Sequence, residues 1–158
     1  MVLGMSLAAF TAVHVVISLI GIASGFVVIF GMLVSKRLPA MTAVFLVATI
    51  LTSVTGFLFP FKGVTPGIVI GILSLLVLAV ATIAWYRGWR GTWVITAMIA
   101  QFFNFFVLVV QLFEKVPALH ALAPTGNETP LKAAQLLTLV AFVVLAIVTY
   151  RKFRPAAA

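Results

Sequence analysis

Five long apolar runs occupy most of the chain and are separated by polar breaks. They cover roughly residues 8–34, 41–59, 66–86, 92–113 and 132–150. An α-helix rises about 1.5 Å per residue and therefore needs about 20 apolar residues to cross a hydrocarbon core about 30 Å thick. The runs have this length, and they lack the alternation of apolar and polar residues that is typical of barrel strands. The pattern predicts an all-α integral membrane bundle of five transmembrane helices, a single transmembrane domain over residues 1–158.

The breaks between the runs contain residues that end helices. Three of them are short, SKRLPA, PFKGVTP and YRGWRG, and a longer outer loop is expected at residues 114–131. Proline and glycine in such segments indicate turns between helices. The first run is longer than a bilayer requires, so we expect that helix to tilt or project.

The basic residues are divided unequally between the two sides of the membrane. With the N-terminus outside, seven lie inside (Lys36, Arg37, Arg87, Arg90, Arg151, Lys152, Arg154) and three outside (Lys62, Lys115, Lys132). The preference of basic residues for the cytoplasmic side then predicts an N-out, C-in orientation. All the Trp and Tyr residues fall at the same predicted inner interface, where amphipathic rings accumulate (Trp85, Tyr86, Trp89, Trp93, Tyr150).

The composition narrows the possible chemistry. Hydrophobic residues make up 65% of the chain, against roughly 45–50% in soluble domains, and the net charge is +8. Because the basic residues lie in connections rather than on one amphipathic face, nucleic-acid binding is not expected. The absence of Cys and Asp excludes thiol redox chemistry, disulfides, thiolate metal sites and aspartate-driven mechanisms. We expect no enzyme activity, no cofactor and no metal, and a lipid bilayer as the surrounding partner.

The segment QFFNFFVLVVQLFEK, residues 101–115, covers the second half of the fourth run and the two residues after it, and it is polar for a membrane span. At 100° per residue, Gln101, Asn104, Gln111 and Lys115 share an arc of about 80°. Phe102, Phe106 and Phe113 lie on the opposite side. The pattern predicts an inward face of amides and a lipid-facing side of phenylalanines.

Small and hydroxyl residues form similar seams on the other runs. Thr11, His14, Ser18, Gly21 and Gly25 share one arc of the first run, and Gly67 and Gly71 form a second GxxxG in the third. Small residues let helix backbones approach closely, and hydroxyls and amides hydrogen-bond across the contact for about 0.6 kcal/mol each. We interpret the four glycines as helix-packing positions. Further seam residues are expected on the second run (Thr42, Thr49, Ser53, Gly56) and the fifth (Gln135, Thr138, Thr149).

The expected depths of several polar residues in the membrane predict a candidate polar cluster toward its outer side. Its members are His14, Ser18, Asn104, Gln111, Glu114 and Gln135. A titratable His beside a Glu could relay protons or bind a cation. Alternatively, Glu114 reaches water beside Lys115, and His14 is simply a hydrogen-bonded packing residue.

Two segments carry a resemblance to known proteins. LTSVTGFLFPF (residues 51–61) and NFFVLVVQLFEKVPALHALAPT (residues 104–125) resemble a group of small, multi-spanning bacterial inner-membrane proteins. The likeness extends over most of the chain from the first span onwards. It implies a multi-pass protein of the bacterial inner (cytoplasmic) membrane, and it brings no activity and no catalytic residue with it.

Three functions fit these patterns. The first is a structural or accessory subunit that assembles as a homo-oligomer or with a membrane-protein partner. The second is an oligomeric channel or transporter for a small solute or ion, built around the polar cluster. The third is an anchor for haem or quinone, for which His14 lies within a span and His120 lies in the loop.

Overall fold

The computed structural model describes residues 1–60, 63 and 66–155. Its helices are α1 (Leu7–Leu33), α2 (Pro39–Gly56), α3 (Pro66–Tyr86), α4 (Arg90–Lys115), α5 (Pro117–His120) and α6 (Thr129–Lys152). All of them except α5 are long and apolar enough to cross a membrane. The prediction of an all-α bundle with five transmembrane helices is therefore confirmed.

Local chemistry explains where the helices begin and turn. The Ser6 hydroxyl accepts a hydrogen bond from the Ala9 N–H at 3.2 Å and caps α1. Pro39, Pro66 and Pro117 are each the first residue of a helix, where a missing N–H has no cost. Gly88 has φ +68° in the tight turn from α3 to α4, a conformation that favours glycine.

The outer loop contains more helix than expected. The segment predicted as loop, residues 114–131, includes the end of α4, all of α5 and the start of α6. The short helix α5 was not predicted, because four residues are too few to show a helical period. As a result, the two ends of the loop are helical, and irregular backbone is limited to Val116 and the segment between α5 and α6.

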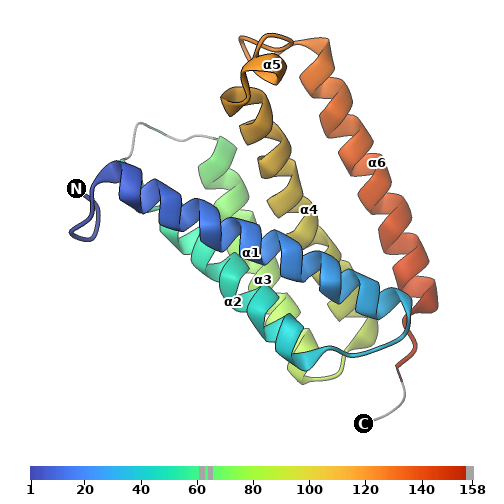
Figure 1. The fold of residues 1–158 in the computed structure, drawn as a ribbon. Helices are drawn as coiled ribbons and strands as arrows, with labels where there is room; N and C mark the ends of the chain where they lie inside the picture. The colour runs from blue at the N-terminus through green and yellow to red at the C-terminus, as the bar shows by residue number, and fades with distance from the viewer. Residues whose placement is uncertain (61–62, 64–65, 156–158) are drawn as a thin grey trace.

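The helix α4 lies at the centre of the packing. It packs against α3, α6 and α1, while α1 lies along α2 (Figure 1). All the fully buried residues of α4 lie between Trp93 and Gln101. From Phe102 to Val110 every position is half-buried, and Figure 1 shows α1 diverging from α4 and α6 toward this end. The core is therefore concentrated in the half of the bundle that holds the chain's C-terminal end.

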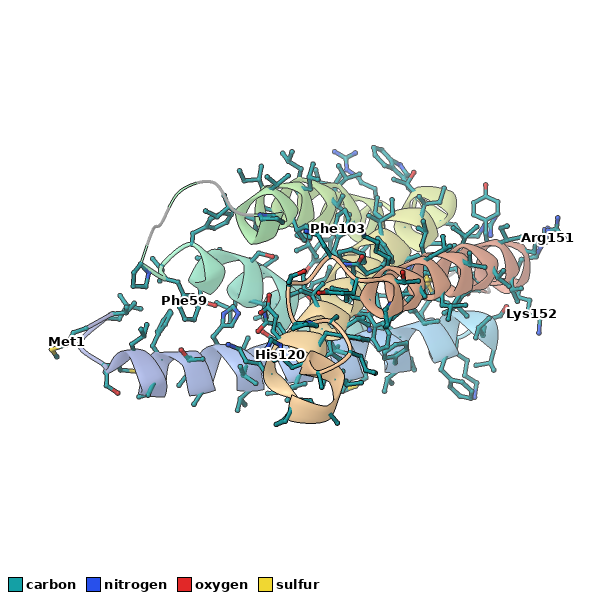
Figure 2. All side chains as sticks on the ribbon, turned by 90° about the horizontal axis from the view of Figure 1, so that it is seen from above. Met1, Phe59, Phe103, His120, Arg151 and Lys152 are labelled. Carbon is teal, nitrogen blue, oxygen red and sulfur yellow. The ribbon has the colours of Figure 1, made fainter. Side chains whose placement is uncertain are left out.

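The two ends of the bundle carry different residues. Figure 2 shows Phe59 at the same end as Met1, while Arg151 and Lys152 project at the opposite end. We call the end with Arg151 and Lys152 the inner end and the end with Phe59 and α5 the outer end. The names follow the predicted orientation.

Two sequence-based expectations about aromatic residues need correction. Phe102 was predicted to face lipid, but its ring packs against Phe142 of α6, with centroids 5.7 Å apart. Trp93 was expected among the interfacial rings, yet it is only 2% exposed and packs on Trp85. In both cases a neighbouring helix covers a residue whose apolar ring fits protein as well as lipid, so hydropathy could not separate the two environments.

Candidate functional site

The largest of the fully buried polar side chains is Gln101, which is 0% exposed. Its Nε2 donates a hydrogen bond to the carbonyl oxygen of Ile22 in α1 at 2.8 Å. A methyl group on Gly25 would overlap the amide of Gln101 and come within 2.9 Å of the Phe45 ring. Glycine at position 25 therefore creates the space in which the buried amide reaches α1.

A second amide contact lies one turn further along α4. Asn104 Nδ2 donates to Thr49 Oγ1 in α2 at 3.1 Å. A Cβ on Gly21 would stand 3.2 Å from that same Thr49 oxygen, so α1, α2 and α4 meet closely here. Gly21, Gly25, Thr49, Gln101 and Asn104 form what we call the central polar seam. The inward orientation predicted for Gln101 and Asn104 agrees with these contacts.

His14 has a separate set of partners nearer the outer end. Its Nδ1 lies 2.8 Å from Thr55 Oγ1 of α2, and its ring meets Phe59 edge-on at 5.2 Å between centroids. Ser18 donates to the carbonyl of His14 within α1. The Thr55 hydroxyl also donates to the Leu51 carbonyl, so it acts as the acceptor when His14 Nδ1 carries the proton.

The remaining members of the predicted outer cluster lie elsewhere. Gln111 Nε2 donates to Glu114 Oε2 at 3.0 Å, and both side chains are exposed at the end of α4. Gln135 is half-buried on α6. The hydrogen bonds of His14 and Glu114 thus go to different helices, and the six residues are divided among separate contacts instead of forming one site.

The other predicted packing residues have mixed outcomes. A Cβ on Gly71 would come within 2.9 Å of the Phe57 ring, so this glycine receives the end of α2 against α3. Gly67 lies at an exposed position of α3. Thr42, Thr49, Ser53, Thr138 and Thr149 are buried, as their seam positions predicted.

A cluster at the inner end was missed by the sequence analysis. Arg37 Nη2 donates to the Trp85 carbonyl at 3.2 Å, and its guanidinium lies 4.3 Å from the centroid of the Trp85 ring. Arg90 Nη1 donates at 2.8 Å to both the Tyr150 and Phe153 carbonyls. These carbonyls lie at the C-terminal ends of α3 and α6, where unpaired oxygens attract cations. Both arginines therefore act as caps for other helices.

Ser35 completes this inner-end connection. It has φ +57° in the turn after α1, and its hydroxyl donates to the Lys152 carbonyl at 2.6 Å. The Arg154 N–H donates back to the Ser35 oxygen at 3.1 Å. Ser35, Arg37 and Arg90 together tie all five spans at one end, and we call them the inner-end clamp.

The outer loop is organised by a carboxylate. Glu128 accepts hydrogen bonds from the Thr125 hydroxyl and N–H and from the Asn127 N–H, at 2.7 to 2.9 Å. These donors, with the Thr125 hydroxyl foremost, lower the pKa of Glu128 from 4.5 to about 2. Glu128 therefore remains ionised and holds the loop just before α6.

The chemistry available in the spans is mainly that of packing. His14 already contacts Thr55, and His120 is exposed on α5, so the two histidines belong to different parts of the fold. Among the described residues, no three of His, Cys, Asp or Glu come together as metal ligands would. From Gln101 toward the inner end, the buried face of α4 continues with the apolar residues Met98, Ala97 and Val94.

Comparison of the chain with known protein families, curated proteins and solved structures finds no match. The resemblance to small bacterial inner-membrane proteins stays a prediction. The function must therefore be argued from the arrangement of the residues themselves.

Proposed function

We propose that the chain is a non-enzymatic subunit of a bacterial inner membrane, working through assembly with another membrane protein or with copies of itself. The observation that carries the proposal is that His14, Gln101 and Asn104 each bond to another helix of the same chain. These polar groups fix one packing of α1, α2 and α4. This arrangement is better suited to a scaffold than to a catalyst or a proton relay.

Three of the four predicted packing glycines are covered within the chain, so the proposed assembly uses another surface. Gly21, Gly25 and Gly71 all face side chains of neighbouring helices in this chain. By contrast, α6 buries only one strip, formed by Leu131, Thr138, Phe142 and Thr149. Large aliphatic side chains on the rest of α6 are exposed, with Leu137 at 69%. We propose that this uncovered side of α6 contacts the partner.

The orientation belongs to the same proposal. Lys36, Arg37, Arg87, Arg90 and the C-terminal basic residues share the inner end, and Tyr86, Trp89 and Tyr150 are exposed there. Positive charge and amphipathic rings at one end support a cytoplasmic inner end and an N-out, C-in topology.

The first experiment is native mass spectrometry of particles extracted gently from native membranes. We expect a stoichiometric complex with a second membrane protein or a defined homo-oligomer. A monomer carrying only lipid, at every protein concentration tested, would contradict the assembly role. A homo-oligomer alone would direct attention to conduction, which liposome flux through the Asn104→Leu and Gln111→Leu variants would test.

A pair of variants locates the surface. Leu137→Trp enlarges the uncovered side of α6, while Leu76→Trp makes the same change on α3, where Leu76 is 62% exposed. If α6 contacts the partner, Leu137→Trp weakens the complex and Leu76→Trp leaves it intact. If both sides face only lipid, the two variants behave alike.

A further inference from the structure

A small cavity lies beside the inner-end clamp. Its volume is about 40 Å³, and Arg37, Trp85, Arg90, Trp93 and Phe153 contribute to its wall. A water molecule occupies about 30 Å³ of liquid, so the cavity has room for one small ion or molecule. The α1–α2 turn, the α3–α4 turn and the segment after α6 all border this space.

The wall contains an indole group without a partner. Trp93 is 2% exposed, and its Nε1 is buried with no hydrogen-bond acceptor among the described residues. An indole nitrogen is only a donor, so it requires an acceptor atom. A buried donor without one costs free energy, and such a group calls for an explanation.

The two charged side chains in the cavity wall, Arg37 and Arg90, are both cationic. A guanidinium carries five N–H donors, and the carbonyl contacts of Arg37 and Arg90 each engage a single nitrogen. The two acidic side chains of the chain, Glu114 and Glu128, lie at the outer end. The two guanidinium groups and the indole N–H therefore offer donors and positive charge, and no side-chain carboxylate among the described residues lies in the cavity wall.

We propose that this cavity binds the acceptor atom of one small anion between Arg37, Arg90 and Trp93. The anion is either a free halide or a phosphate oxygen of a lipid headgroup at the inner interface. Bound there, it accepts a hydrogen bond from the indole, reduces the repulsion between the two arginines and strengthens the inner-end clamp. Arg37 is exposed at the rim, which gives the anion a route from the inner side.

Indole NMR tests the proposal directly. The full chain is labelled with ¹⁵N-tryptophan and placed in micelles of a maltoside detergent, which carries no phosphate, in gluconate buffer, and chloride then replaces gluconate at constant ionic strength. The three tryptophans give three indole signals, and the variants Trp93→Phe and Trp89→Phe assign all three. We expect a saturable shift of the Trp93 signal, while exposed Trp89 serves as the internal control. No saturable shift of Trp93 with either anion source would overturn the proposal.

Two variants test the role of the arginine. Arg37→Gln should weaken the apparent chloride affinity at least about tenfold, because it removes a charged donor. Lys36→Gln removes the same charge from a neighbouring residue that does not line the cavity, and it should change the affinity by less than about twofold because a charge outside the site is screened. Equal effects of the two variants would contradict a specific site. Circular dichroism establishes whether each variant is folded. If a variant is unfolded, the chloride titration of the wild-type chain still tests the proposal.

The lipid composition distinguishes the two sources of the anion. When phosphatidylglycerol is titrated into the chloride-free micelles, a saturable shift of the Trp93 signal identifies a headgroup phosphate as the acceptor. A shift with chloride alone identifies a free ion.

Discussion

The contact between Gln101 and Gly25 couples the two residues energetically. A side chain on residue 25 would overlap the buried amide, so Gly25→Ala should destabilise the bundle by about 1–3 kcal/mol through overpacking. Gln101→Ala loses the bond to the Ile22 carbonyl but makes space for the new methyl group. We expect the double variant to be more stable than the sum of the single effects by about 1–2 kcal/mol.

Unfolding in mixed micelles measures this double-mutant cycle. The matched control combines Gly71→Ala with Gln101→Ala, because Gly71 faces Phe57 and shares no partner with Gln101. This second cycle should be additive within about 0.5 kcal/mol. Additivity in both cycles would contradict the coupling.

Glu128 should titrate unusually low. Its hydrogen bonds stabilise the carboxylate, so they support the folded loop fully above pH 4.5, and this contribution is lost as the pH falls toward the pKa of about 2. Thr125→Val removes the hydroxyl donor and should raise the pKa part of the way toward 4.5. The chain has only two glutamates, so ¹³C carboxyl NMR resolves both, and Glu114→Gln assigns them. An ordinary titration midpoint for Glu128 would contradict the loop geometry.

At the scale of elements, the last turn of α6 depends on a residue of α4. Arg90 donates to two carbonyls there and lies 4.9 Å from the centroid of the Tyr150 ring. Lysine keeps the charge but lacks the planar guanidinium group, which can donate hydrogen bonds to the carbonyls and stack on the Tyr150 ring at the same time. Arg90→Lys should therefore lower the local opening free energy by roughly 1–2 kcal/mol.

Hydrogen exchange of the amides in residues 149–153 measures this effect, with about tenfold faster exchange expected. Arg87→Lys is the control, because Arg87 is exposed and has no recorded side-chain hydrogen bond in the described part of the chain. Unchanged exchange in Arg90→Lys would show that α6 ends independently of α4.

The spans were predictable because length and hydropathy are properties of each segment alone. The residues against which each helix face packs were not predictable from the sequence. Gln101 and Gln111 share a predicted face, yet one is wholly buried and the other exposed, because α1 and α4 separate between them. The clamp contacts of Arg37 and Arg90 join residues 48 to 63 positions apart. The preference of basic residues for the cytoplasmic side already accounted for both arginines, so their sequence positions gave no further sign of these contacts. Periodicity carries no information about such pairs.

At the scale of the whole molecule, the helices are tied at one end and separate at the other. The inner end combines the clamp, the buried part of α4 and the basic residues. The outer end has half-buried α4 residues, α5 and the loop held by Glu128. Motion of the bundle should therefore be largest at its outer end, where fewer side chains are enclosed.

Single cysteines test which end faces the cytoplasm, and the chain has no native cysteine to interfere. Asn127, Lys36 and Arg151 are all exposed, the first at the outer end and the others at the inner end. In intact bacterial cells, a membrane-impermeant maleimide should label Asn127→Cys and should reach Lys36→Cys and Arg151→Cys only after permeabilisation. The opposite pattern would invert the orientation. Labelling of Lys36→Cys and Arg151→Cys from opposite sides would contradict five spans, because four of them separate these residues.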